Sequence, residues 1–282
     1  MVIIQKTFTE KKSILYLVST PIGNISDISL RALQILKEVE VIFSEDTRIA
    51  RKLLNFYNFK TPLISFYEYN EKKRIKEILF LLEQGKDLAL ISDAGTPLIS
   101  DPGLCLVKEV KKAGFHVTAI PGASAFLSAF IMSSFESPFC FLGFLPKKKQ
   151  QKHVFLQKYR FFNGSIIIYE TSKRLLDTLF LIKKCYNKRN ISISRELTKK
   201  FETIINGDID EILKQDFILK GEYVLVIEKN KSSYSELGLT LDEHIDFYLQ
   251  QGFSEKESFS KVAKYRKISK KEIYKKYKIL NK

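Results

Sequence analysis

The 282-residue sequence contains no tryptophan and few residues that bind metals or form cross-links. Its three cysteines, Cys105, Cys140 and Cys185, are odd in number, far apart and outside any C-x-x-C pattern. This spacing argues against a disulfide framework and against a zinc site. The three histidines are scattered as well, so we expect no bound metal. Such cysteines are typical of reduced core residues, and we expect a cytoplasmic protein.

The sequence also lacks the usual signatures of nucleotide-binding and exported proteins. No two glycines are separated by a single residue, and no G-K-[ST] is present. This excludes dinucleotide or nucleoside triphosphate binding through G-x-G-x-x-G or a P-loop. No apolar segment follows a basic start at the N-terminus, so a secretion signal is not expected. Residues 115–135 carry no formal charge, but Pro121 and Gly122 divide them, which predicts a buried strand, a turn and a buried helix.

Positive charge is what the sequence has in excess. The net charge is +15, and two segments carry most of it. Residues 147–160 contribute +6 and residues 255–282 contribute +8, whereas the other 240 residues sum to +1. Basic clusters beside a neutral body favour a polyanionic partner. The simpler alternative is that these lysines only solvate exposed faces.

Apolar runs of strand length alternate with segments of helical period, such as 28–39 and 46–57. The expected strands fall in two series: 14–19, 39–44, 62–67, 88–92 and 115–120, then 139–145, 165–170, 190–197 and 223–228. Continuous apolar strands between helices indicate sheets covered on both faces. We therefore predict an α/β protein with two tandem α/β domains, residues 1–122 and 123–230, that meet near 121–136.

Residues 236–282 have a different pattern. Ser254 with Glu257, and Ser269 with Glu272, fit the S-x-x-E capping box that begins a helix. An earlier helix, 241–250, is expected to end at Gly252. Three short helices with tight turns predict a small helix-turn-helix-like module. The alternative is that Phe247, Phe259 and Tyr277 pack onto the body, so that the segment is part of one fold.

Turn formers and carboxylates gather in four loops of the first domain. These loops, 20–24, 45–48, 93–103 and 121–125, follow its first, second, fourth and fifth expected strands. In open α/β sheets, ligands bind at the carboxyl ends of the strands. The four loops therefore predict a binding site at one edge of the first sheet, with 93-DAGTPLISDPG-103 as its central loop.

These loops, together with the runs 15–48, 141–146, 169–175, 195–199 and 221–228, resemble the tetrapyrrole-methylase superfamily and, within it, the methyltransferases of small-subunit ribosomal RNA. The sequence departs from the family pattern only by small residues, at Ser19-Thr20 and Ala123-Ser124. The resemblance implies transfer of a methyl group from S-adenosylmethionine to the 2′-hydroxyl of a cytidine ribose. It also implies a homodimer that acts on ribosomal RNA, and a cofactor cleft between the two α/β domains.

The resemblance also assigns site residues. Carried onto matching positions, it places the following against the cofactor: Pro21, Gly23, Ser92, Asp93, Ala94, Gly95, Thr96, Gly122, Ser124, Ala125, Phe144, Tyr169, Leu197, Glu222 and Tyr223. Small residues permit close approach, and aromatic faces suit adenine and a sulfonium cation. The candidates for contact with RNA are Arg48, Lys147, Lys148, Lys149, Lys152, Arg195, Lys199, Lys264, Arg266, Lys270 and Lys271.

A ribose hydroxyl is a poor nucleophile while protonated, so a nearby carboxylate is expected to help remove the proton. The candidates are Asp46, Asp101, Glu170 and Glu196, and the sequence does not choose among them. Two other functions remain open: methylation of a small tetrapyrrole, and non-catalytic RNA binding on the ribosome. The basic segments argue against the first, and the small residues in every pocket loop argue against the second.

Overall fold

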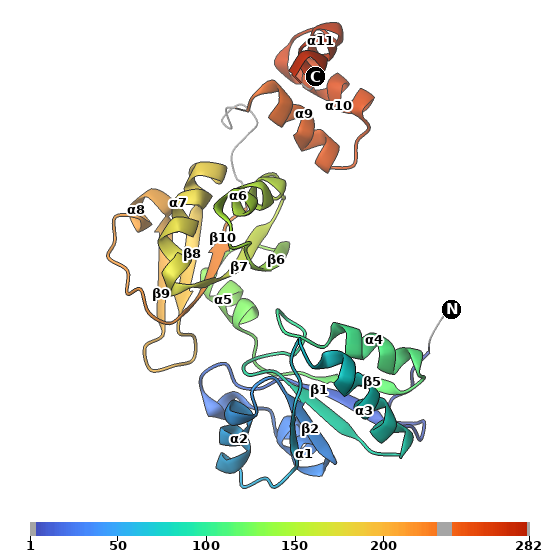
Figure 1. Cartoon of the computed structure of the whole chain (residues 1–282). Coiled ribbons are helices and arrows are strands. Elements are labelled where there is room, and N and C mark those ends of the chain that lie inside the picture. Colours follow the sequence, from blue (N-terminus) through green and yellow to red (C-terminus); the bar gives the residue numbers. More distant parts are fainter. Residues whose placement is uncertain (1–3, 230–238, 281–282) are drawn as a thin grey trace.

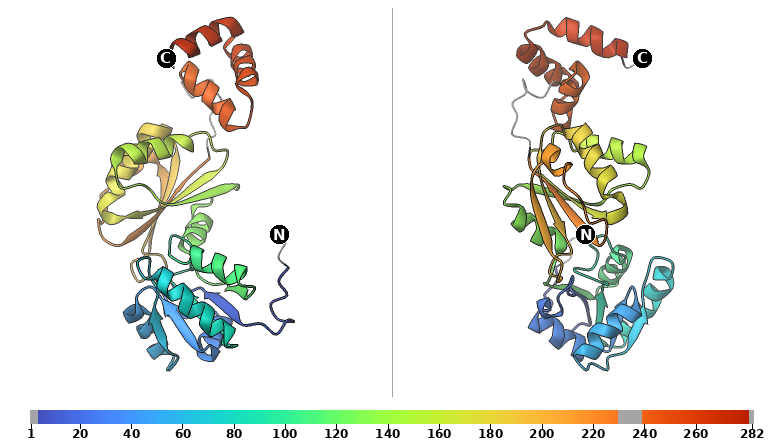
Figure 2. Two further views of the ribbon diagram at one scale, coloured as in Figure 1. Left: turned by 45° about the vertical axis from the view of Figure 1, so that its right-hand side comes forward. Right: turned by 90° about the vertical axis from the view of Figure 1, so that its left-hand side faces the viewer.

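The computed structural model describes residues 4–229 and 239–280. They form two α/β domains and a group of three helices, arranged in a row (Figure 1 and Figure 2). The predicted fold is confirmed. Among the residues described, no helix combines the length and the apolar character needed to cross a membrane.

The first sheet contains five parallel strands in the order β3-β2-β4-β1-β5. They are β1 (Ile14–Val18), β2 (Val41–Ser44), β3 (Leu63–Ser65), β4 (Leu88–Ile91) and β5 (His116–Ile120). All five lie within or close to the segments expected from the sequence. Because every strand runs the same way, the loops that follow them meet at one edge of the sheet.

Helices cover both faces of this sheet. Helices α1 (Leu30–Glu38) and α2 (Thr47–Phe56) pack on the face that presents Tyr16 and Val18. Helices α3 (Glu71–Glu83) and α4 (Leu104–Lys112) pack on the opposite face, which presents Leu15 and Leu17. Successive side chains of a strand point to opposite faces, so a continuous apolar strand supplies both cores. A short 3₁₀ turn, Ile25–Asp27, precedes α1.

The second sheet is mixed, with the order β6-β7-β10-β8-β9. Its strands are β6 (Phe139–Phe144), β7 (Ser165–Thr171), β8 (Asn190–Arg195), β9 (Thr203–Asp208) and β10 (Glu222–Ile227). Only β6 and β7 pair in parallel, and the other pairs are antiparallel. The sequence did not predict β9. This strand pairs only with β8 and has no fully buried residue, so it carries a weak apolar signal.

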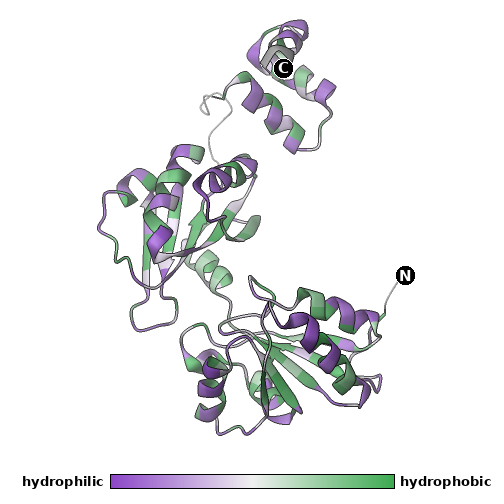
Figure 3. Ribbon diagram, in the orientation of Figure 1, coloured by the Kyte–Doolittle hydropathy of each residue, from purple (hydrophilic) through white to green (hydrophobic). Residues whose placement is uncertain are grey.

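One helix covers one face of the second sheet, and three cover the other. Helix α5 (Ala125–Ser133) packs against Ile167, Val224 and Val226, and it is apolar along its length (Figure 3). Helices α6 (Lys149–Lys158), α7 (Leu175–Tyr186) and α8 (Ile209–Ile212) share the opposite core, and a 3₁₀ turn, Ser172–Arg174, precedes α7. The strand and the helix predicted within 115–135 are present as β5 and α5, and they separate at Pro121 and Gly122. The prediction that the helix is buried is wrong, because only Ala129 and Ser133 of α5 are buried.

The C-terminal helices α9 (Leu241–Gln250), α10 (Glu255–Arg266) and α11 (Lys270–Leu280) have a core of their own, built from Ile245, Phe259, Val262 and Ile273. Capping boxes begin α9 at Thr240 and α10 at Ser254. At the start of α11, Ser269 accepts a hydrogen bond from the amide of Glu272 at 3.2 Å.

The module also contacts the second domain. Arg160 forms an ion pair with Glu243, and the rings of Phe161 and Phe247 meet edge to face, with centroids 5.2 Å apart. The alternative hypothesis, that aromatic residues of this segment pack onto the body, is therefore right for Phe247. Phe259 and Tyr277 pack in the module's own core. The domain limits at 122 and 123 remain a prediction, and those at 230 and 236 fall outside the described residues.

Candidate active site

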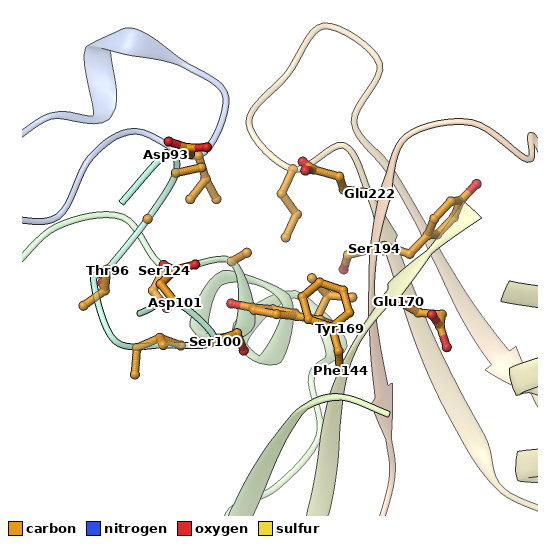
Figure 4. Close-up of a pocket in the computed structure, with 18 of the residues that line it drawn as sticks. Asp93, Thr96, Ser100, Asp101, Ser124, Phe144, Tyr169, Glu170, Ser194 and Glu222 are labelled. Atoms are coloured by element: carbon orange, nitrogen blue, oxygen red, sulfur yellow. The ribbon is translucent and has the colours of Figure 1, made fainter. Parts of the chain in front are cut away.

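A pocket of about 340 Å³ lies between the two α/β domains, within the size range of small-molecule sites. Figure 4 shows Asp93 and Asp101 of the first domain on one side, with Tyr169 and Ser194 of the second domain on the other. The lining residues are Ile22, Glu45, Asp93, Ala94, Gly95, Thr96, Ile99, Ser100, Asp101, Ser124, Ala125, Phe144, Tyr169, Glu170, Thr171, Ser194, Leu197, Lys199, Gly221, Glu222, Tyr223 and Val224.

The first-domain wall is built from the loops at the carboxyl edge of its sheet, as predicted. Thr20 and Gly95 exchange backbone hydrogen bonds of 2.8 and 3.0 Å. Gly95 has φ +83°, and a side chain there would approach Ile22, which explains the glycine. The Thr96 hydroxyl lies 3.0 Å from the Ser19 hydroxyl and donates to the carbonyl of Ala123 at 3.3 Å. These bonds join the loops after β1, β4 and β5 into one rigid wall.

The central loop also holds an unusual backbone. Leu98 and Ser100 have φ of +70° and +72°, the left-handed region that ordinary residues seldom occupy. Such strain clusters at ligand sites. Here it places Ile99, Ser100 and Asp101 against the pocket. No sequence signal marks Leu98 or Ser100 for this conformation.

The two domains meet beside the pocket at the loop between β8 and β9. The backbone amide of Asn24 donates to the Thr198 hydroxyl at 3.0 Å. A side chain on Gly23 would come within 2.4 Å of Lys199 and 2.8 Å of Thr198. Gly23 therefore permits the contact between domains that closes one side of the pocket, rather than lining the pocket itself.

Aromatic rings form the second-domain wall. The rings of Phe144 and Tyr169 have centroids 5.5 Å apart. The Tyr169 hydroxyl accepts a hydrogen bond from the amide of Phe126 at 3.2 Å, which ties β7 to the start of α5. Phe144 is about half exposed, so its ring is available to a ligand.

Three carboxylates lie on the opposite wall. Burial, reinforced by Glu45 and Asp93, raises the pKa of Asp101 to about 6, against a smaller opposing effect of a hydrogen bond from Ser92. Burial and neighbouring carboxylates also raise the pKa values of Glu45 and Asp93. Like charges in a partly buried site disfavour ionisation, and a cationic ligand relieves that repulsion.

One polar group in the pocket lacks a partner. The Ser194 side chain is fully buried, and its Oγ has no hydrogen-bond partner within the described part of the chain. Buried hydroxyl groups normally have a hydrogen-bond partner. A free hydroxyl, crowded carboxylates and exposed aromatic faces together fit a ligand that is cationic and carries polar groups and a flat ring.

Most of the predicted cofactor residues do line this pocket. Asp93, Ala94, Gly95, Thr96, Ser124, Ala125, Phe144, Tyr169, Leu197, Glu222 and Tyr223 all face it. Pro21, Gly23, Ser92 and Gly122 are not among the lining residues; Gly122 instead packs its backbone against Ser19. The sequence missed Ile22, Glu45, Ile99, Ser100, Thr171, Ser194, Gly221 and Val224, all of which are neighbours of motif residues or parts of the strands that carry them.

Of the four candidate general bases, only Asp101 has a carboxylate available to the pocket. Glu170 is 1% exposed, and its carboxylate points away from the cavity (Figure 4). It accepts from Thr178 at 2.5 Å and from the Thr171 amide at 2.9 Å, and it pairs with Lys152 and Arg174. Glu170 is thus a structural carboxylate, which corrects its candidacy.

Asp46 and Glu196 lie outside the lining. Asp46 caps α2 and pairs with Arg48, whose hydrogen bonds lower the pKa of Asp46 to about 2. Glu196 accepts from the Glu222 amide at 3.0 Å and from Lys199 at 3.1 Å, so it braces the loop. Asp46 and Glu196 therefore belong to structural ion pairs, with Arg48 and Lys199 respectively.

The RNA candidates divide by exposure. Arg48, Lys147, Lys148, Lys149, Lys264, Lys270 and Lys271 are exposed. Lys152 is wrong as a surface contact, because it is 4% exposed and donates to Thr178 at 2.7 Å. Its position four residues before the buried Leu156 could have shown this, since residues i and i+4 share a helix face.

Three other candidates are occupied by contacts within the chain. Arg195 donates to the carbonyls of Lys220 at 2.8 Å and Phe201 at 3.3 Å. Arg266 donates to His244 and to the carbonyls of Leu239 and Thr240, which fixes α10 against the start of α9. Lys199 bonds Glu196 and Glu222 beside the pocket. Their guanidinium and ammonium groups stabilise loops, which corrects their assignment as free RNA contacts.

Known proteins support the architecture and the motifs. Residues 14–213 match the family Tetrapyrrole (Corrin/Porphyrin) Methylases. The ribosomal RNA small subunit methyltransferase I of Bacillus subtilis (strain 168) is 40% identical over 286 residues, 98% of each chain. The protein of the same name from Mycoplasmopsis pulmonis (strain UAB CTIP) is 46% identical over 75% of this chain and 96% of its own length.

Among solved structures, uroporphyrin-III-C-methyltransferase from Thermus thermophilus has a TM-score of 0.54 with 16% identity, covering 81% of this chain and 100% of its own. The methyltransferase CobJ has a TM-score of 0.60 with 15% identity, covering 79% and 96%. At this identity the structural likeness shows the fold alone. The family match and the identity to the curated relatives go further: the chain belongs to the tetrapyrrole methylase family of methyltransferases.

Proposed function

We propose that this methyltransferase transfers a methyl group to the 2′-hydroxyl of a cytidine ribose in small-subunit ribosomal RNA. The observation that carries the proposal is the 40% identity, along 98% of each chain, to a relative named for the methylation of small-subunit ribosomal RNA. The exposed lysines Lys147, Lys148 and Lys149, at the start of α6, add support. A small tetrapyrrole substrate has no need of them.

Enzymes of this family use S-adenosylmethionine, which supplies an electrophilic methyl group on a sulfonium. The pocket fits this cofactor. Asp93 and Glu45 offer negative charge to its cationic groups, and Phe144 and Tyr169 offer aromatic faces. Ser194 Oγ offers an unused hydrogen bond. The assignment of these side chains to the cofactor is part of the proposal.

Within this site the protein mainly orients the reacting groups. Orientation alone supplies about 7–11 kcal/mol of rate enhancement in favourable systems. The joined loops after β1, β4 and β5, and the contact of Asn24 with Thr198, make the walls rigid. We propose Asp101 as the general base that takes the proton from the ribose hydroxyl, because its carboxylate lines the pocket and its pKa is about 6.

The proposed function is tested by supplying labelled S-adenosylmethionine with small ribosomal subunits, with free ribosomal RNA, or with a tetrapyrrole. We expect label in RNA, recovered as 2′-O-methylcytidine after digestion to nucleosides. Label in the tetrapyrrole would favour the alternative enzyme. Cofactor binding without transfer to any of the three would contradict the proposal.

The C-terminal module is proposed to serve substrate capture. Deleting residues 236–282 should leave the affinity for S-adenosylmethionine within about twofold, since none of the described residues of the module, 239–280, lines the pocket. The KM for the ribosomal particle should rise, and the salt dependence of binding should fall by about 0.7–0.9 logarithmic units for each phosphate that the shortened chain no longer neutralises. The relative from Mycoplasmopsis pulmonis, aligned over 75% of this chain and 96% of itself, supports a pocket that works without the whole chain.

A matched variant separates charge from packing. Changing Lys264, Lys270 and Lys271 together to Gln keeps the module and its contact between Arg160 and Glu243, and should reproduce most of the decrease in salt dependence. Loss of cofactor binding with a large fall in Tm in the truncated chain would show that the module is part of one fold.

The quaternary state and location complete the proposal. We expect a homodimer in the cytoplasm. The exposed apolar side chains of α5, among them Leu127, Ile131 and Met132, support contact with a second copy.

A further inference from the structure

The loop between β8 and β9 presents an aromatic ring to solvent beside the pocket. Phe201 is 65% exposed, although phenylalanine is usually buried. It lies two residues after Lys199, which lines the pocket. The ammonium of Lys200 lies 5.8 Å from the centre of the Phe201 ring, and Lys220 nearby is also exposed.

The backbone beneath this ring is held in place by hydrogen bonds. The carbonyl of Phe201 accepts from Arg195 Nη1 at 3.3 Å and from the Thr203 hydroxyl at 3.1 Å. The loop is also closed internally, because the Thr198 amide donates to the Glu202 carboxylate at 2.6 Å. The Arg195 Nε donates to the carbonyl of Lys220. An exposed ring on a braced backbone is preorganised, since little conformational freedom is lost when a flat group stacks on it.

The same loop contacts the first domain. The bond from the Asn24 amide to Thr198 and the close approach of Gly23 to Lys199 fix the loop against the other pocket wall. The backbone that carries the ring therefore keeps a set position relative to the pocket. Lys199 itself is bonded to Glu196 and Glu222. Lys200 and Lys220 are exposed, and the carbonyl of Lys220 shares Arg195 with the carbonyl of Phe201.

A nucleotide whose ribose enters a pocket must leave its stack, and the exposed bases then gain from aromatic partners. We propose that Phe201 is a stacking platform for a base of the RNA substrate, next to the nucleotide that enters the pocket, with Lys200 and Lys220 facing the adjoining phosphates. This inference rests on the proposed function and adds a specific contact to it. The chemistry is sequence-tolerant, because every base has a flat face.

The first test compares two exposed phenylalanines of the second domain. Phe201→Ala should raise the KM for small ribosomal subunits by about 5- to 150-fold, the range expected for loss of one stacked base. The kcat and the affinity for S-adenosylmethionine should stay unchanged, and Phe201→Tyr should restore the KM. The matched control is Phe180→Ala, on α7, which is 58% exposed and lies outside the pocket lining.

The second test detects the contact directly. The chain has no tryptophan, so Phe201→Trp introduces a single reporter. Ribosomal RNA should quench its fluorescence, whereas the reporter in Phe180→Trp should be unaffected. A KM for Phe201→Ala equal to that of the parent, or no quenching, overturns the stacking role. A change in oligomeric mass in Phe201→Ala would instead assign the ring to a contact between copies. If the parent chain methylates no ribosomal RNA, the proposed function fails, and quenching still decides whether RNA reaches Phe201.

Discussion

Replacement of Ala94 by phenylalanine is expected to weaken binding of S-adenosylmethionine strongly and, with it, methyl transfer. Ala94 lies between Asp93 and Gly95 in the central loop, lines the pocket and is exposed to it. A benzyl group there occupies space that the ligand needs. Overfilling a packed site commonly costs about 1–3 kcal/mol and sometimes more, so we expect the Kd to rise by about 5- to 150-fold or more.

The fold should tolerate this change. Ala94 is not among the residues with positive φ, unlike Gly95, where any side chain would strain the backbone. Surface substitutions away from packed features usually alter the free energy of unfolding by less than about 0.5 kcal/mol. Calorimetric titration measures the affinity, and a melting curve measures the stability. Ala113→Phe, at the exposed end of α4, is the control. An unchanged Kd for Ala94→Phe would show that the cofactor binds elsewhere.

The sequence could predict the first-domain wall of the pocket because the position of its residues follows from the order of strands and loops along the chain. Turn formers that follow parallel strands must meet at one edge of the sheet, so the order of strands and loops along the chain is enough to place Asp93, Gly95 and Thr96. Much of the second-domain wall came from the resemblance, not from a pattern. Ser194 shows why: it belongs to a buried strand, and nothing in its neighbours marks its hydroxyl as free.

The charge of Lys152 and Glu170 was a misleading guide to their function, because both side chains are buried. Lys152 and Glu170 are far apart in sequence, and each was assigned a function by its residue type and its neighbours in sequence. In the fold they share the Thr178 hydroxyl in a buried network. Only the packing of α6 and α7 against β7 brings them together, and single-sequence periodicity gives no pairing between elements. The exposed ring of Phe201 was missed for the opposite reason, since an apolar residue beside a strand is normally expected in the core.

Asp101→Asn is expected to lower kcat by about 100- to 10,000-fold, the usual contribution of a general base, and to leave the fold intact. In the parent chain, kcat/KM for the methyl donor should rise with pH through a limb near 6, because Asp101 accepts a proton only when ionised and its pKa is about 6. The variant should lack this limb. Asp46→Asn should keep it, since Asp46 pairs with Arg48 outside the pocket.

Stability provides an independent check with a defined sign. The folded pKa of Asp101, about 6, lies above its ordinary value of 3.8, so the folded state holds the proton more firmly than the unfolded chain does. The resulting stabilisation is complete below about pH 4 and is lost as the pH rises through 6. Asparagine cannot ionise, so the Asp101→Asn variant does not lose this stability as the pH rises. The Tm of Asp101→Asn should therefore exceed that of the parent at pH 8 and approach it at pH 4. A variant with parental kcat, or with a lower Tm at pH 8, would contradict the assignment of Asp101 as the base. Both expected effects follow from the burial of this carboxylate, reinforced by Glu45.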